Sequence, residues 1–110
     1  MAQVTFVSGN VDVCDYTAGA TISAGDVIVT ADTPRIAQVD IANGAVGALV
    51  VRGGIWRCTG DAAIATNKKV YWDNTNDKVT ETSSGNKLFG VTTSACSGDG
   101  STCLVYFAPI

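Results

Sequence analysis

The sequence predicts an all-β fold, a small β-barrel or sandwich of short antiparallel strands, and two observations lead to this prediction. Short runs rich in Val, Ile, Thr and aromatic residues alternate with glycine-rich turns, which is typical of strands joined by tight connections. No run of ten or more residues has the apolar spacing of a helix. The 110 residues suit a single domain, residues 1–110, which can bury a core without metals or obligatory disulfides.

Each expected strand is a short run with β-branched or aromatic residues that ends near Gly, Asn or Asp. In order, these runs are 3–7, 11–16, 26–30, 35–40, 47–52, 54–58, 69–73, 78–82, 87–93 and 101–108. Two Ala-rich links, 17–25 and 59–67, are each expected to form at most one helical turn, the second capped by Thr59 or Asp61.

A weak internal repeat divides the chain. Residues 20–30 are echoed by residues 62–73, and residues 36–53 are echoed by residues 89–107. The repeat predicts two related β-modules packed into one barrel, although similar hairpin composition alone would also produce it.

The composition excludes several classes of protein. Hydrophobic residues make up 46% and charged residues 15%, the opposite of a disordered chain. The seven Lys and Arg residues are scattered, so no basic stripe is available for nucleic acid. The N-terminus lacks the features of a signal peptide and no apolar run is long enough to span a bilayer, so we expect synthesis in a cytosol and no membrane partner. A surface with so little charge suits packing against other protein.

The segment "CSGDGSTC" places Cys96 and Cys103 on either side of a predicted hairpin tip. Opposed residues of an antiparallel pair have Cα atoms about 4.5–5.5 Å apart, within the range of a disulfide. A redox centre would need a neighbouring cation or a helix N-terminus, whereas the residue between these cysteines is Asp99. The sequence therefore favours an inert pair or a staple. Cys14 and Cys58 are either a second bridge or two small buried hydrophobes.

The chain offers no catalytic or metal-binding set. It has no histidine, no CxxC spacing, no G-x-S-x-G elbow and no phosphate-binding loop. The acidic stretch 72–81 resembles a calcium loop only briefly, because Lys78 stands where that loop needs glycine, and a hairpin turn accounts for the same residues. We therefore expect a protein that is not an enzyme and has no cofactor.

The largest apolar side chains are Trp56, Tyr71 and Trp72. They are expected either in the core or in an intersubunit contact. Because Tyr71 and Trp72 are adjacent in a predicted strand, they must point to opposite faces, so that one can lie in the core and the other in an interface.

Four blocks of the sequence, in this order and spacing, resemble a known family. "DYTAGATISAGDVIVT" (15–30), "IAQVDIANGAVGALVVRGGIW" (36–56), "AIATNKKVYWDNTNDKVT" (63–80) and "GNKLFGVTTSA" (85–95) are similar to the capsid cement, or head-decoration, proteins of tailed phages. The resemblance implies a small β-barrel on the outside of the virion capsid, made in the host cytoplasm. It also implies binding to the major capsid protein as a homotrimer that clamps neighbouring capsomers.

An extended N-terminal arm, residues 1–8, would suit such a role, since a strand can add to an exposed sheet edge of the shell. The candidate contact residues are Gln3, Val4, Thr5, Phe6 and Val7, in which apolar Val4 and Phe6 alternate with polar neighbours. The same segment can equally be an ordinary edge strand of the barrel.

A second function remains open from the sequence. A β-sandwich binding module, for carbohydrate or a host surface, would use Trp56, Tyr71 or Trp72 as an exposed stacking platform.

Overall fold

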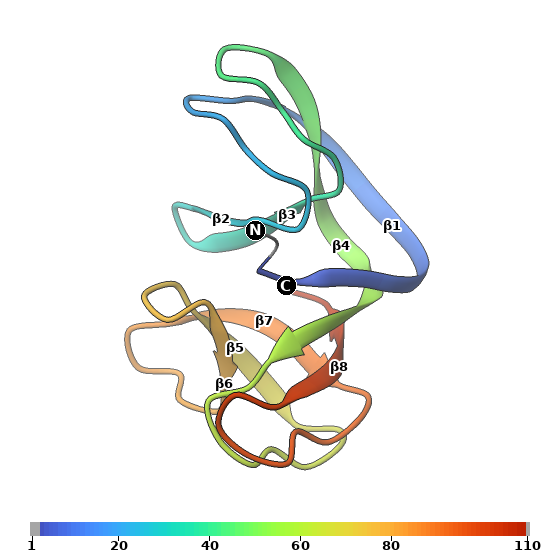
Figure 1. The fold of residues 1–110 in the computed structure, drawn as a ribbon, viewed down its shortest axis with the longest axis vertical. Coiled ribbons are helices and arrows are strands. Elements are labelled where there is room, and N and C mark those ends of the chain that lie inside the picture. The colour runs from blue at the N-terminus through green and yellow to red at the C-terminus, as the bar shows by residue number, and fades with distance from the viewer. Residues whose placement is uncertain (1–2, 110) are drawn as a thin grey trace.

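The computed structural model describes residues 3–109, which form an eight-stranded antiparallel sheet that curls into a half-barrel (Figure 1). The strands are β1 (Thr5–Thr17), β2 (Val27–Thr30), β3 (Thr33–Ala37), β4 (Val46–Thr59), β5 (Lys69–Asp73), β6 (Lys78–Thr80), β7 (Lys87–Thr92) and β8 (Thr102–Phe107). The predicted all-β class is confirmed.

β4 connects the two halves of the molecule (Figure 1). The sheet order is β2-β3-β4-β8-β7-β5-β6. β3 and β8 pair with different parts of β4, and β1 pairs with the edge of β4 opposite to both. We call residues 3–50 the first half and residues 53–109 the second half. In the second half the sheet curls far enough for Gly60, just after β4, to form a parallel bridge with Val79 of β6.

Two pairs of predicted strands are each one longer, bent strand. Runs 3–7 and 11–16 fall largely within β1, and runs 47–52 and 54–58 fall within β4. Glycine caused the difference: Gly53 and Gly54 have φ of 100° and 81°, so they bend β4 without ending it. β1 follows the bend through irregular pairing between residues 6 and 13.

The two links expected to contain a helical turn do not, because each is held extended by a bridge. Ile22 exchanges backbone hydrogen bonds of 2.8 and 2.9 Å with Ile41, and Ile64 exchanges bonds of 3.0 and 2.9 Å with Cys96. Both isoleucines are buried. Burial of the isoleucine and its antiparallel bridge override the weak helical preference of the flanking alanines.

The same hydrogen bonds give the sequence repeat a structural basis. Three residues after each bridged isoleucine comes a residue with positive φ, Gly25 in the first half and Asn67 in the second. The Gly25 amide donates to Ala37, and the Asn67 amide donates to Thr92 in the equivalent position. A shift of 42 residues therefore relates the segment from residue 18 to residue 30 to the segment from residue 60 to residue 72.

Two clusters of buried side chains form the core. The larger spans both halves, with Val4, Val27 and Ile36 from the first half and Trp56 from the second. It also contains three neighbouring aromatic rings, in which the ring centroid of Phe89 lies 5.4 Å from that of Trp72 and 4.8 Å from that of Phe107. The smaller cluster lies in the first half and consists of Ala18, Ile22, Ala37, Ile41 and Leu49.

Candidate functional site

The N-terminal segment, in which the candidate contact residues lie, is divided by its hydrogen bonds into an anchor and an exposed part. The amides of Gln3 and Val4 both donate to Gly25 O, at 3.1 and 3.0 Å, and the Val27 amide donates to Gln3 Oε1 at 2.6 Å. Val4 is only 2% exposed. Gln3 and Val4 thus hold the segment against the first half and have little surface left for a partner.

Thr5, Phe6 and Val7 form the exposed part of this segment. Phe6 is 42% exposed and Val7 38% exposed, although the Phe6 ring also packs edge-on against Trp56, with 5.1 Å between centroids. Thr5 lies opposite Arg57 in the β1–β4 ladder. Of the predicted arm, residues 1 and 2 lie outside the described residues, and residues 5–8 are an edge strand in this structure.

A shallow hollow of about 220 Å³ lies beside this segment. It is lined by Val4, Thr5, Phe6, Ala24, Gly25, Ala37, Gln38 and Trp56. None of these lining residues is titratable or nucleophilic beyond the Thr5 hydroxyl. The hollow can therefore receive an apolar side chain of a partner, and its lining supplies no acid or base for chemistry.

The three large aromatic residues are mostly core. Trp56 and Trp72 are each 1% exposed, and their indole N–H groups donate to Gly53 O at 3.0 Å and to Asn74 Oδ1 at 3.2 Å. Tyr71 is half-buried and lies on the face of β5 opposite to Trp72. An exposed stacking platform for sugars cannot be built from the two tryptophans, so the structure removes the main argument for a carbohydrate-binding module.

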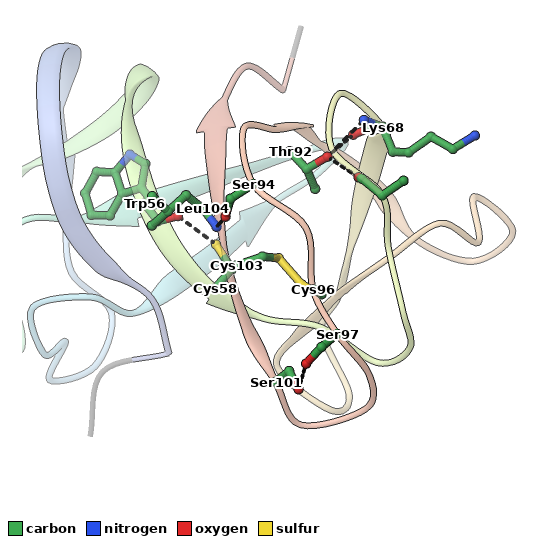
Figure 2. Close-up of a disulfide and its surroundings, with 11 residues drawn as sticks. Trp56, Cys58, Lys68, Thr92, Ser94, Cys96, Ser97, Ser101, Cys103 and Leu104 are labelled. Carbon is green, nitrogen blue, oxygen red and sulfur yellow. Dashed lines mark hydrogen bonds between the residues drawn. A yellow bond between two sulfur atoms is a disulfide. The ribbon is translucent and has the colours of Figure 1, made fainter.

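Cys96 and Cys103 form a disulfide at the base of the 97–101 loop (Figure 2). The sulfur atoms are 2.01 Å apart and the Cα atoms 4.8 Å apart. Both cysteines are buried, at 2% and 3% exposure. Cys103 lies opposite Cys58 in the β4–β8 ladder, and the backbone of Cys96 pairs with that of Ile64. The disulfide therefore joins β8 to the segment that pairs with Ile64.

Cys14 and Cys58 do not pair. Cys14 lies opposite Leu49 of β4, and Cys58 is nine residues further along that strand, up to about 30 Å away at 3.3 Å per residue. Burial raises the pKa of the Cys58 thiol, as expected for a small core residue. The half-buried Cys14 accepts a hydrogen bond from Arg35 Nη1 at 2.6 Å.

The disulfide loop also carries an ion pair. Lys78 Nζ lies 2.8 Å from Asp99 Oδ1 and connects β6 to the loop tip. The hydrogen bond and the charge of Asp99 raise the pKa of Lys78, and those of Lys78 lower the pKa of Asp99. Because both groups are solvated, this pair orients the loop and adds little stability.

Across residues 3–109, no three His, Cys, Asp or Glu side chains converge in a way that could hold a metal ion. Nor does this part of the chain contain a helix long and apolar enough to cross a membrane. The main features of the surface are the exposed strand β1 and the hollow beside it.

Comparison with known proteins places these features in context. The family model for phage cement protein matches residues 7–107, nearly the whole chain. The chain belongs to the phage cement protein family. A comparison with curated proteins found no match.

Family membership assigns this cement protein a structural role in association with the phage capsid. Its exposed apolar side chains therefore become relevant. Four of them lie along the β1–β4 ribbon, namely Phe6, Val7, Val13 and Val46. Val13 and Val46 were not among the predicted site residues, because the sequence does not reveal which face of a strand is left uncovered.

The disulfide of the cement protein gives a direct prediction. Replacing both Cys96 and Cys103 by Ala should lower the free energy of unfolding by about 2.5 kcal/mol, because the unfolded chain loses a closed loop. Urea unfolding under non-reducing conditions measures this change. The wild-type protein in reductant serves as the matched control and should unfold at a similar urea concentration. Equal stability of oxidised wild type and variant would show that the bridge contributes nothing.

Proposed function

We propose that this cement protein binds the outer surface of the assembled capsid shell, contacts the major capsid protein and holds neighbouring capsomers together. The observation that carries the proposal is the set of exposed apolar side chains on the β1–β4 ribbon of a protein with few charged residues. Phe6 is 42%, Val13 51% and Val46 67% exposed, and such residues gain most when a protein partner covers them.

The exposed residues Thr5, Phe6 and Val7 belong to the proposed contact, and Gln3 and Val4 support it from below. Among residues 3–109, β1 pairs with a strand on one edge only, so its other edge presents unpaired backbone groups beside the exposed side chains. A strand of the shell can pair with such an edge, and the side chains of that strand can then cover exposed apolar side chains of β1.

Stabilisation of the shell then follows from mass action. A protein that binds only the assembled lattice adds RT ln(1 + [L]/Kd) per site, about 2.7 kcal/mol when its free concentration is 100 times Kd. Binding as a homotrimer on the virion exterior would add the contributions of three subunits at one position. Since synthesis would take place in the host cytoplasm, the Cys96–Cys103 bridge would close after release of the particle.

Co-sedimentation with purified particles that lack the protein tests the proposal. Wild type should bind saturably, and Val13→Asp should bind at least about tenfold more weakly because a charge would be buried in the contact. Ser84→Asp, which adds the same charge on an exposed loop of the second half, is the matched control and should bind as wild type does. Wild type that fails to bind any particle would refute the proposal.

The oligomeric state is measured separately. Light scattering after size exclusion distinguishes the 11.3 kDa chain from its trimer. A trimer that forms only on the particle would appear as threefold density in an electron-microscopy map, and isolated single copies there would contradict the trimer.

A further inference from the structure

The second half contains a strand, β6, that has no counterpart in the first half. The place in the first half that corresponds to β6 is therefore vacant among the described residues. In the second half, β6 pairs antiparallel with the outer edge of β5, through Tyr71–Thr80, Trp72–Val79 and Asp73–Lys78. By the shift of 42 residues, β5 corresponds to β2. β2 ends the sheet, and no strand of residues 3–109 pairs with its outer edge (Figure 1).

A segment that would flank the added strand on its other side is also present in both halves, namely the residues after β4 in the second half and the residues after β1 in the first. In the second half the Asp61 amide donates to Val79 O at 3.1 Å, so β6 is held between β5 and the segment after β4. The corresponding residue in the first half is Gly19. Its amide forms no backbone hydrogen bond to another described residue, and a Cβ at Gly19 would meet no atom within 4 Å. The space that β6 occupies in the second half is therefore open in the first.

Burial differs at the residues that β6 would cover. Val70 and Cys58 are 0% and 1% exposed in the second half. Their counterparts in the first half, Ile28 and Tyr16, are only partly buried against the smaller core cluster. The first half thus has the interior of a closed module but lacks the strand that would seal it.

The outer edge of β2 has backbone groups available for pairing. Thr30 and Thr33 close the two-residue turn, and Val29 lies opposite Pro34, which has no N–H. Because hydrogen-bonded and non-hydrogen-bonded pairs alternate in an antiparallel ladder, the N–H and C=O of Val29 point away from β3. The Val27 amide already donates to Gln3 Oε1, so the free part of the β2 edge begins at Val29. Val29 corresponds to Tyr71 by the shift of 42 residues, and Tyr71 is where the pairing of β5 with β6 begins.

We propose that an extended segment of the capsid shell protein adds to the outer edge of β2 at Val29 and completes the first half as β6 completes the second. This inference rests on the proposed function and names a second contact surface for it. In β6, buried Val79 stands between Lys78 and Thr80, so the fitting segment has one β-branched apolar residue between small or basic polar neighbours.

The charge of the first half indicates this occupant. Residues 3–50 hold five aspartates and one arginine, whereas residues 53–109 hold five basic and five acidic residues. A basic segment is therefore attracted to this edge. Another open strand edge of the cement protein, β1, carries Asp12 and Asp15 and no basic residue, so β1 of a second copy would bring further acidic residues to the acidic first half.

Val29→Pro tests the proposal, because proline removes the outward N–H and is tolerated on an edge strand. Val29→Ala, which keeps that N–H, is the matched control. Binding to particles that lack the protein should weaken about tenfold for Val29→Pro and remain near wild type for Val29→Ala. Urea unfolding of the free variants reports their stability, and hydrogen exchange of wild type should show the Val29 amide protected only on the particle.

The outcomes separate this inference from the proposed function. Wild type that binds particles while Val29→Pro binds equally well and the Val29 amide stays unprotected would overturn the inference and leave the function intact. Wild type that does not bind would refute both. A Val29→Pro variant that loses self-association in solution would assign the position to a second copy and overturn the choice of occupant. If Val29→Pro fails to fold, the exchange of the wild-type Val29 amide decides alone.

Discussion

Replacing Trp56 by Ala should lower the free energy of unfolding by about 3–5 kcal/mol, a large part of the 5–15 kcal/mol typical of a domain. Trp56 is 1% exposed and lies in the core cluster that joins the two halves. Removing it leaves a cavity that the bent sheet cannot close, exposes one face of Phe6 and leaves Gly53 O without the indole N–H that reaches it at 3.0 Å.

Chemical unfolding followed by circular dichroism measures the change for Trp56→Ala. Trp56→Phe, which keeps most of the apolar volume but loses the N–H, should lose less than half as much. Tyr106→Ala on neighbouring β8, where the side chain is 36% exposed, is the control for aromatic truncation and should cost about 1 kcal/mol or less. Equal losses for the alanine variants of Trp56 and Tyr106 would contradict the assignment of Trp56 to the shared core.

The fold class was predictable because it depends on local patterns. Runs such as "KVYWD" are rich in β-branched and aromatic residues, and β5 occupies the same residues 69–73 that the sequence indicates. The lengths of β1 and β4 were not predictable, since a glycine pair in sequence looks the same whether it ends a strand or bends one. Only the close approach of β1 to β4 at Gly53 shows that the glycine pair bends the strand and does not end it.

The candidate site was predictable in part. The sequence drew attention to the N-terminal segment, but its alternation could not show that Val4 is buried at 2% whereas Phe6 is 42% exposed. That distinction depends on hydrogen bonds from Gln3 and Val4 to Gly25, more than twenty residues away. The vacant edge of β2 likewise required the paired register of both halves, although the faint repeat already pointed to a comparison between them.

The bend that joins the two halves gives the second large effect. Gly53 has a φ of 100°, and a Cβ there would lie 2.5 Å from Asn10 O and 3.2 Å from Val11 Cα, both backbone atoms of β1. An alanine must therefore adopt an unfavourable conformation, at about 1–2 kcal/mol, and push β1 away, at about 1–3 kcal/mol. Gly53→Ala should lower the free energy of unfolding by about 2–5 kcal/mol.

Gly44→Ala separates the two causes, because Gly44 has a similar φ of 83° and a Cβ there would meet nothing within 4 Å. It should lose only the conformational part, about 1–2 kcal/mol, in the same urea unfolding experiment. The difference between the two variants then measures the contact between β1 and β4 at the bend. Since β1 also carries the proposed capsid contact, Gly53→Ala should weaken particle binding and Gly44→Ala should not. Equal stability of the two variants would show that β1 can move away from the bend freely and is not fixed by it.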